Sequence, residues 1–285
     1  MNQKVFAIFV GAIMVLSAFA GFVLRGNDQE TTVVGSESTS LQAFGVQGRL
    51  VDWNFESLED VLEMSPESTV MAYWINLSAP QNLTDSARDV LPKSLGLTYE
   101  SQLYSTPIER LAEAFFNNTR IEFHWIKPFR LAYSGLVVPY EDYMMIPTST
   151  DYVTVMGKPT LFGTQDAMRQ VIDVISGGLS TNNFTLPIGE KADLQVAALG
   201  KGAAGSTLSG NFKEFYLGVA ASADGNNGYN LTVKYLQPDT GTSQKAKELA
   251  EKYGLGYSTQ GSRDEISGQV KAGDLKEVLA AILVP

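Results

Sequence analysis

The sequence predicts an α+β fold: two small subdomains, each a mainly antiparallel sheet covered by amphipathic helices, behind an N-terminal transmembrane helix. Three observations predict it. Short β-rich runs are separated by turn residues, apolar stripes at helical spacing begin after Ser, Thr or Asp, and a twenty-residue run without a charged side chain lies near the N-terminus. Locally paired strands beside amphipathic helices are typical of α+β proteins.

The uncharged run extends from Val5 to Leu24 and reads VFAIFVGAIMVLSAFAGFVL. A helix of this length reaches roughly 30 Å, the thickness of a bilayer core, and this one has no polar face. Lys4 precedes it, whereas Asp28 and Glu30 follow soon after Arg25, which favours a cytoplasmic N-terminus. Residues 1–25 are therefore expected to tether a body that lies outside the cytoplasm to the cell membrane.

Cleavage is the alternative for this segment. Ala18-Phe19-Ala20 fits the small-x-small pattern of a signal-peptide cleavage site and would release a secreted chain beginning at Gly21. Retention is favoured because the apolar run continues past Ala20 and is longer than a usual signal peptide core.

Five Asn-x-Ser/Thr triplets follow the apolar segment, none with proline in the middle. They predict N-glycosylation and agree with an exported surface. Their asparagines are Asn76, Asn82, Asn117, Asn183 and Asn230.

The amino-acid composition excludes several kinds of site and partner. The chain has no cysteine and one histidine, so disulfides, thiolate metal sites and cysteine nucleophiles are excluded. The formal net charge of -10 opposes binding to phosphate backbones, so nucleic acid is not an expected partner.

The body is predicted to begin after a flexible stalk rich in Ser, Thr and Gly at 26–45. A first α+β subdomain, rich in aromatic residues, occupies 46–178. A linker at 179–191 contains Pro, Gly and a glycosylation triplet, and a second α+β subdomain occupies 192–285.

In the first subdomain, Ser57 and Asp60 resemble a capping box and predict a short helix. Thr164 is expected to cap a helix that ends at Gly177-Gly178, with an apolar stripe of Ala167, Met168, Val171, Ile172 and Ile175. Another helix is predicted after Pro107, over IERLAEAFF, with Leu111, Ala114 and Phe115 on one face. Strands are expected at 46–53, 69–77, 121–126, 129–138 and 151–156.

In the second subdomain, strands are expected at 193–199, 212–221, 229–236 and 265–271. Asp224-Gly-Asn-Asn-Gly228 predicts a hairpin turn between the second and third of these strands. Helices are expected at 243–253, ending at Gly254, and after Asp274 over LKEVLAAIL.

The chain resembles membrane-anchored surface proteins of methanogenic archaea. The resemblance rests on VFAIFVGAIMVLSAFAGFVL, the scattered glycosylation triplets, the absence of cysteine and the phrase VTVMGKPTLFGTQDAMRQVIDVI. It implies a surface location and no particular activity.

Two glycine motifs suggest cofactor binding, but neither has the required context. Gly200-Lys-Gly-Ala-Ala-Gly205 spells G-x-G-x-x-G, yet Gly210-Asn211 breaks any following helix and Asp224 lies in a turn. Gly157-Lys158-Pro159-Thr160 lacks the residue order of a phosphate loop. A mobile loop and a structural turn are expected, and no cofactor.

No catalytic or metal site is predicted. His124 shares a strand face with Glu122, opposite Phe123 and Trp125, and is expected to be solvated. The acidic pairs Glu59-Asp60, Glu141-Asp142 and Asp264-Glu265 are also expected at the surface. The aromatic residues of the first subdomain form either its core or a ligand platform; they are Trp53, Trp74, Trp125, Tyr73, Tyr133, Tyr140 and Tyr143.

These observations favour a non-enzymatic, membrane-tethered extracytoplasmic protein with a structural or interaction role at the cell envelope. Its partner would be an envelope protein or a glycan. The alternative is an extracytoplasmic binding module for a carbohydrate or small ligand, and a third possibility is a carboxylate-based hydrolase.

Overall fold

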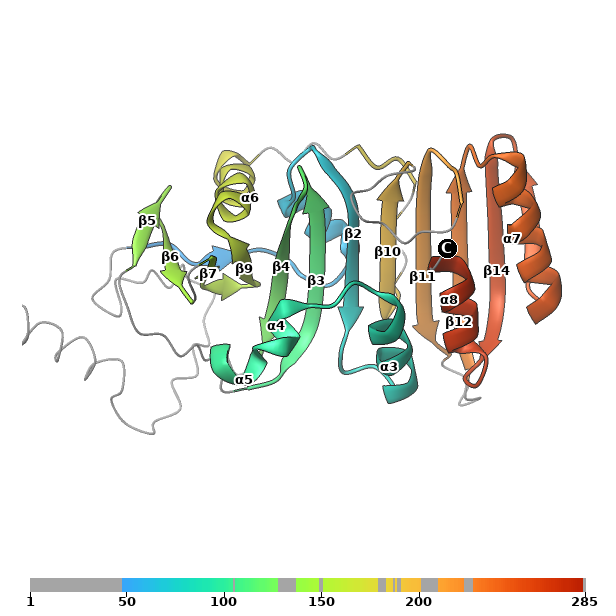
Figure 1. Ribbon diagram of the computed structural model, residues 1–285, viewed down its shortest axis with the longest axis horizontal. Helices are drawn as coiled ribbons and strands as arrows, with labels where there is room; N and C mark the ends of the chain where they lie inside the picture. Colours follow the sequence, from blue (N-terminus) through green and yellow to red (C-terminus); the bar gives the residue numbers. More distant parts are fainter. Residues whose placement is uncertain are drawn as a thin grey trace, which may run out of the picture.

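A computed structural model describes residues 48–104, 106–127, 137–148, 151–178, 183–186, 188, 191–200, 210–222 and 228–283. Within them, one antiparallel sheet of twelve strands extends through the molecule (Figure 1), in the order β13-β14-β12-β11-β10-β2-β3-β4-β9-β7-β6-β5. The short strands β1 and β8 pair separately and in parallel. The predicted α+β class with a mainly antiparallel sheet is therefore confirmed.

The bounds of the elements follow. The strands are β1 (Val51–Asp52), β2 (Thr69–Asn76), β3 (Ile108–Phe116), β4 (Thr119–Ile126), β5 (Val138–Tyr140), β6 (Tyr143–Pro147), β7 (Tyr152–Val155), β8 (Gly157–Lys158), β9 (Thr160–Thr164), β10 (Leu194–Leu199), β11 (Glu214–Ala221), β12 (Gly228–Leu236), β13 (Gly256–Gln260) and β14 (Arg263–Lys271). The helices are α2 (Leu58–Met64), α3 (Gln81–Val90), α4 (Leu95–Thr98), α5 (Glu100–Leu103), α6 (Gln165–Gly177), α7 (Thr240–Tyr253) and α8 (Leu275–Leu283).

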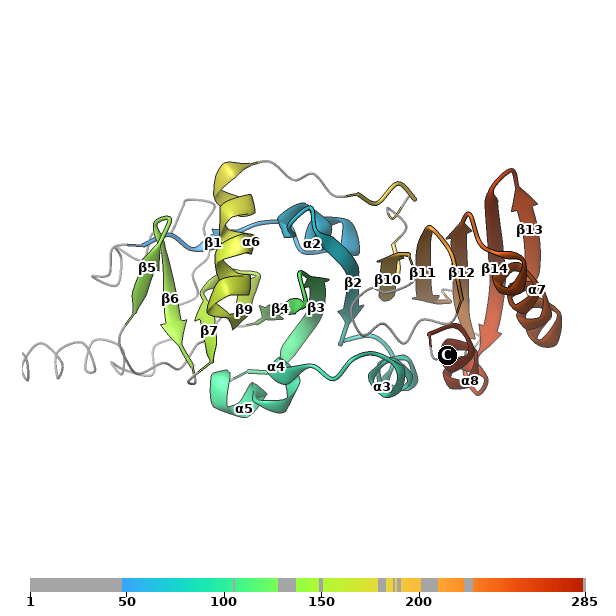
Figure 2. The ribbon, with the colours of Figure 1, turned by 45° about the horizontal axis from the view of Figure 1, so that its top comes forward.

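Helices cover the two faces of the sheet unequally. Figure 2 shows α2 and α6 on one side of the sheet and α3, α4, α5 and α8 on the other side. One core cluster joins β2–β4 to α2 and α6, and a second joins the opposite face to α3, α7 and α8. In the β10–β14 half, α7 and α8 cover one face, and α2 contacts the other face at β10. Strand β12 lies farther from α2 and alternates between buried and half-buried or exposed residues.

Several local predictions are confirmed. Ser57 and Asp60 form the capping box of α2. Thr164 accepts a hydrogen bond from the backbone N–H of Ala167 at the start of α6, which buries the five stripe residues named from the sequence. Strands β11 and β12 form the expected hairpin, and Gly254 ends α7 in the left-handed conformation.

The helix predicted over IERLAEAFF is wrong, because these residues form strand β3 between β2 and β4. Asn117 and Asn118 both adopt positive φ and turn β3 directly into β4. Such a two-residue turn matches the twist of a hairpin. Both faces of β3 are covered, so its apolar residues do not alternate and resemble a helical stripe.

Further strands differ from the sequence prediction. β6, β9 and β13 were not predicted, although β13 pairs with β14 along its whole length. Of the strand predicted at 129–138, only its end at Val138 falls within the described residues, as the first residue of β5.

The sheet continues across the boundary predicted at 179–191, because β10 of the second segment pairs with β2 of the first. The buried Glu214 carboxylate on β11 accepts hydrogen bonds from the backbone N–H groups of Thr185 and Leu186. Gln195 on β10 accepts another from the N–H of Leu58, at the start of α2. Parts of the linker and both segments are thus tied together by buried polar side chains.

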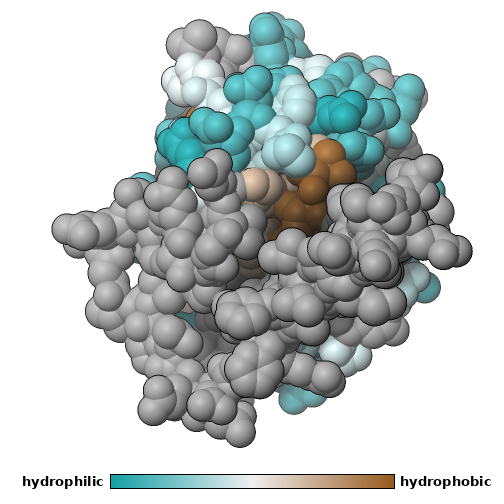
Figure 3. Space-filling model, turned by 90° about the vertical axis from the view of Figure 1, so that its left-hand side faces the viewer, coloured by the Kyte–Doolittle hydropathy of each residue, from teal (hydrophilic) through white to brown (hydrophobic). Residues whose placement is uncertain are grey.

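The predicted transmembrane segment and stalk lie outside the described residues. Among the helices that the structure describes, none is long and apolar enough to cross a membrane. In Figure 3, which looks onto the β5–β6 end of the sheet, the described residues in view are mainly hydrophilic, with an apolar patch beside them.

Candidate functional site

A row of polar side chains crosses the centre of the sheet. Tyr73 on β2 is the register partner of Glu113 on β3, and Glu113 is the partner of Glu122 on β4. All three are at most 2% exposed. Ionisable groups this deeply buried require partners, because an unpaired buried charge is strongly unfavourable. We call these residues, together with Ser94, Tyr104, Arg120 and His124, the buried polar row.

Glu122 holds the covering segment onto the sheet. Its Oε2 accepts hydrogen bonds from Ser94 Oγ (2.7 Å) and the N–H of Gly96 (2.8 Å), and Oε1 accepts one from the N–H of Leu95 (2.7 Å). Burial opposes ionisation of this carboxyl, but hydrogen bonds from His124, Ser94 and Gly96 outweigh it and lower its pKa. Glu122 is therefore a buried anion that anchors the start of α4.

His124 is fully buried, so the predicted solvated histidine is wrong. Its Nε2 lies 3.0 Å from Glu122 Oε2, and its Nδ1 lies 2.6 Å from the hydroxyl of Tyr104. Burial raises the pKa of Tyr104, which keeps its hydroxyl protonated and able to donate. A neutral ring with its proton on Nε2 satisfies both contacts.

Glu122 and His124 make one face of β4 polar in the sequence, but the 94–104 segment covers that face. The fit is close: a Cβ on Gly96 would lie 2.3 Å from the His124 ring and 2.6 Å from Glu122. No local pattern in β4 signals such a cover, since its contacts come from residues 20 to 28 positions earlier in the chain.

Glu113 differs from Glu122. It accepts a hydrogen bond from Tyr73 Oη (2.9 Å) and lies 2.9 Å from Arg120 Nη1, but no backbone N–H of the described residues donates to it. Burial, with a further contribution from the Glu122 charge, raises the pKa of Glu113 to about 8 despite Arg120. Glu113 is thus largely protonated at neutral pH, whereas its neighbour Glu122 is ionised.

A cavity of about 180 Å³ adjoins the row between α3 and α4. Apolar side chains form most of its wall, and Arg88 and Lys93 contribute cations. Tyr73 and Ser94 connect it to the buried polar row. The lining residues are Tyr73, Ile75, Leu77, Arg88, Leu91, Pro92, Lys93, Ser94, Leu97, Thr98 and Leu111.

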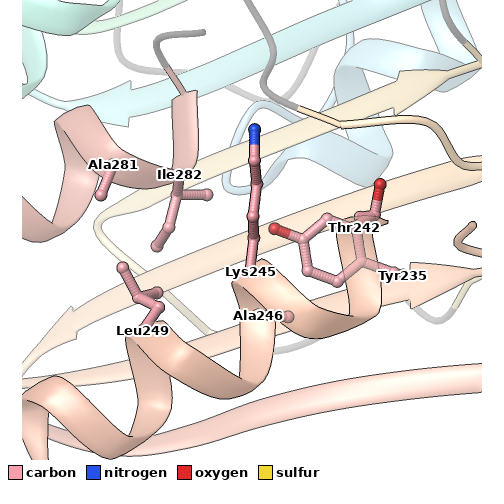
Figure 4. A pocket seen from close by; sticks show the side chains of 7 residues that line it. All are labelled: Tyr235, Thr242, Lys245, Ala246, Leu249, Ala281 and Ile282. Carbon is pink, nitrogen blue, oxygen red and sulfur yellow. The ribbon is translucent and has the colours of Figure 1, made fainter. Parts of the chain in front are cut away.

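A second, smaller gap lies between α7 and α8 (Figure 4), where Ala246 and Leu249 of α7 lie near Ala281 and Ile282 of α8. Its volume of about 30 Å³ is close to that of one water molecule. This gap is too small for an organic ligand, so the cavity beside α3 is the better candidate site.

The five glycosylation asparagines are spread over the described surface. Asn82, Asn117, Asn183 and Asn230 are exposed, whereas Asn76 is half-buried. The Nδ2 group of Asn76 donates to Asp193, that of Asn117 to Gln170 and that of Asn183 to the backbone of Glu67. Asn82 instead accepts a hydrogen bond from Tyr229 through its Oδ1 atom.

The other sequence motifs are not brought together. Most of the G-x-G-x-x-G motif and Asp224 lie outside the described residues; the motif's first glycine, Gly200, follows β10, which pairs antiparallel with β11. Gly157-Lys158 forms β8 against β1. Within the described part of the chain, no three His, Asp or Glu side chains are arranged to hold a metal ion.

Among the acidic pairs, the surface prediction is wrong for Asp264. This carboxylate is 3% exposed and accepts hydrogen bonds from Tyr257 and Thr259 of β13. Like Glu122 and Glu214, it ties a neighbouring segment to the sheet.

The aromatic residues do not form one platform. Trp74 and Tyr73 point to opposite faces of β2 and are buried in different cores, and Tyr143 is also buried. Trp53 and Trp125 are half-buried. Tyr133 lies outside the described residues, and Tyr140 donates a hydrogen bond to Asp173.

Sequence reasoning missed Glu113, Tyr104 and Ser94 as parts of a site. One available signal was Glu113 between the apolar residues Leu111-Ala112 and Ala114-Phe115. It was not used, because this run was predicted as a helix and not as a buried strand.

No protein-family model matches the chain, and no curated protein matches it. Three crystal forms of TP0453 are similar to it among solved structures. Form I has 10% identity and a TM-score of 0.47 over 78% of this chain and 97% of that one. Form III has 11% identity and a TM-score of 0.48, covering 78% of this chain and 98% of that one. Form IV has 11% identity and a TM-score of 0.45, covering 77% of this chain and 96% of that one. Similarity at this level does not define the function of the chain.

Proposed function

We propose that this chain is a non-enzymatic, membrane-tethered extracytoplasmic protein with a structural or interaction role at the cell envelope. The observation that carries the proposal is the uncharged run Val5–Leu24, followed by a Ser/Thr/Gly-rich stalk at 26–45 and a body with five glycosylation triplets. The body consists of two α+β subdomains that share one sheet. Its partners are an envelope protein or a glycan.

The placement of the glycosylation triplets supports an exported body. Oligosaccharide is attached at the side-chain nitrogen, which must be accessible to the transferase. Asn82 and Asn230 are exposed, and we expect them to be modified most completely. At Asn76 the same nitrogen is half-buried and bonded to Asp193, so we expect modification there to be incomplete.

Protease treatment of intact native cells tests the orientation. We expect the body to be degraded or shortened by external protease while a cytoplasmic control protein survives, and the chain to remain in the membrane fraction after washing with high salt. A body protected until the cells are lysed would contradict the proposal. A mature chain that begins at Gly21 and is found in the soluble fraction would replace the anchor with secretion.

Mass mapping of glycopeptides from the native host gives a second test. Carbohydrate at Asn82 and Asn230 is the expected result. Unmodified asparagine at all five triplets would remove this support for an exported body, whereas a host without the transferase would not test it.

A binding module for a small ligand is the second candidate function. The observation in its favour is the cavity between α3 and α4, which combines an apolar wall with two cationic side chains. Ligand sites are concave and mostly apolar, with a few polar groups that orient the ligand.

A further inference from the structure

We infer that the cavity between α3 and α4 binds a small carboxylate whose apolar part is one aromatic ring or a chain of about six carbon atoms. This inference rests on the second candidate function and names its ligand class. The residues that line the cavity come from β2 and its end, β3, the last turn of α3, the 91–94 connection and α4. Figures 1 and 2 show where these elements lie.

The apolar wall sets the kind of ligand and its size. Ile75 and Leu111 extend from the sheet, and Leu77, Leu91 and Leu97 close the sides. The cavity volume of about 180 Å³ slightly exceeds that of an engineered apolar cavity of about 150 Å³ that binds benzene. One ring or a short alkyl chain therefore fits, whereas a disaccharide or a long acyl chain is too large.

The hydroxyl groups of Tyr73 and Ser94, which line the cavity, already have partners. The hydroxyl of Tyr73 donates to Glu113, and that of Ser94 donates to Glu122. A ligand does not have to supply a hydrogen bond to either of them, so its apolar part can lie beside them. The charged part of the ligand is then left for the cationic lining residues.

Two cationic lining residues, Arg88 and Lys93, set the charge of the ligand, and we call them the cationic rim. Both are exposed, so they can meet a charged group without being buried. Asp85 lies 3.9 Å from Arg88, with more than half of its side chain exposed. Two exposed cations in the lining, on a chain of net charge -10, favour an anionic group.

The wall is held in shape without a ligand. Glu122 fixes residues 94–96 through three hydrogen bonds, and the backbone carbonyl of Lys93 accepts a further one from Arg120. A site whose wall is already ordered has a smaller entropy cost on binding.

The test uses the full chain in lipid nanodiscs, with empty nanodiscs subtracted, and measures binding of hexanoate, benzoate, 1-hexanol and glucose by calorimetry. We expect hexanoate and benzoate to bind with a Kd of about 0.1–1 mM. Hexanol should bind about five- to tenfold more weakly, because it lacks the charge that meets the rim. Glucose should not bind.

Two variants locate the site. The double variant Arg88→Ala/Lys93→Ala should lose about five- to tenfold in hexanoate affinity and leave hexanol unchanged. The matched control Lys247→Ala/Arg263→Ala removes two exposed cations elsewhere and should leave both affinities unchanged. Leu97→Phe, which fills the cavity from the half-buried side of α4, should abolish saturable binding of both ligands.

The outcomes separate the inference from the function on which it rests. Equal loss of hexanoate binding in the rim variant and its control, or binding unaffected by Leu97→Phe, would overturn the site. Binding of hexanol or glucose without binding of the carboxylates would overturn the ligand class and leave the binding module standing. No saturable binding of any probe would overturn both, and none of these results bears on membrane orientation.

Discussion

The two halves of the twelve-stranded sheet use the same antiparallel pairing but bury it differently. In the β10–β14 half, one face packs on α7 and α8. The other face is buried at β10 and β11 but carries half-buried or exposed residues on β12, such as Asn230 and Thr232. In the β2–β4 half, both faces are covered, and one of them encloses the buried polar row. Buried carboxylates occur in both halves, but Glu113 and Glu122 of the β2–β4 half are register partners on neighbouring strands and influence each other.

A second layer that packs on the other face of a sheet changes what the side chains on that face require. Side chains alternate across a strand, so a face open to water can carry polar residues at little cost. Once a second layer covers that face, every polar residue left on it must find a partner. Glu122 and His124 find theirs in the covering segment itself, and this segment also forms a wall of the cavity.

The largest expected effect is at Glu122. Glu122→Gln replaces a buried anion that accepts four hydrogen bonds by a neutral amide, and it should lower the free energy of unfolding by about 3–5 kcal/mol. Denaturant unfolding measures the change. The control is Glu265→Gln on β14 in the other half, where a change within about 0.5 kcal/mol is expected. Similar losses at the two positions would remove the proposed difference between the halves.

Leu279→Ala tests the apolar half. Leu279 is completely buried on α8, and its truncation should cost about 2–5 kcal/mol because it leaves a cavity against the sheet. Lys276→Ala on the exposed side of the same helix serves as the control, since its partner is the half-exposed Asp89. If Leu279→Ala were as mild as Lys276→Ala, α8 would not be part of the core.

The pH dependence of stability should differ between the halves through Glu113. Its pKa is raised from 4.5 to about 8 in the folded protein, so folding takes up a proton between these values. Its contribution to stability is complete below about pH 4.5 and is lost as the pH rises through about 8. We expect the free energy of unfolding to fall by a few kcal/mol between pH 6 and pH 9.

Glu113→Gln should flatten this slope, whereas Glu109→Gln, at a half-buried position of the same strand, should keep it. Glu122 does not contribute in this window, because its pKa is lowered and its effect falls below about pH 4.5. An unchanged slope in Glu113→Gln would assign the pH dependence to another group.

The smallest expected effect comes from one kind of substitution made at two positions, on β7 and on β12. Thr154 on β7 is fully buried, and its hydroxyl has no hydrogen-bond partner among the described residues. Thr154→Val should therefore stabilise the protein by about 1 kcal/mol. Thr232→Val on the half-buried, less covered face of β12 should change stability by less than about 0.5 kcal/mol. A destabilised Thr154→Val would mean that the hydroxyl is satisfied by water.

Many elements could be predicted from the sequence alone, because capping residues, apolar periodicity and glycines determine them locally. A capping box starts α2, a threonine cap and five apolar positions define α6, and Gly254 ends α7. Strands β10, β11, β12 and β14 were predicted, whereas β13 was missed. Of these, β12 keeps the alternation of buried and half-buried or exposed residues that marks a strand. The uncharged N-terminal run and the glycosylation triplets predict a tethered, exported protein in the same local way.

Only the tertiary structure decided which element IERLAEAFF forms, which face of β4 is buried, and which ionisable groups meet. β3 becomes a strand because Asn117 and Asn118 turn it onto β4 and because β2 pairs with its other edge. His124 becomes buried because residues 94–104 pack over it. Glu113 acquires its raised pKa from burial and from Glu122 on the next strand. These properties depend on segments distant in the sequence, and free energies of burial and of charge interaction are set by three-dimensional surroundings rather than by neighbours along the chain.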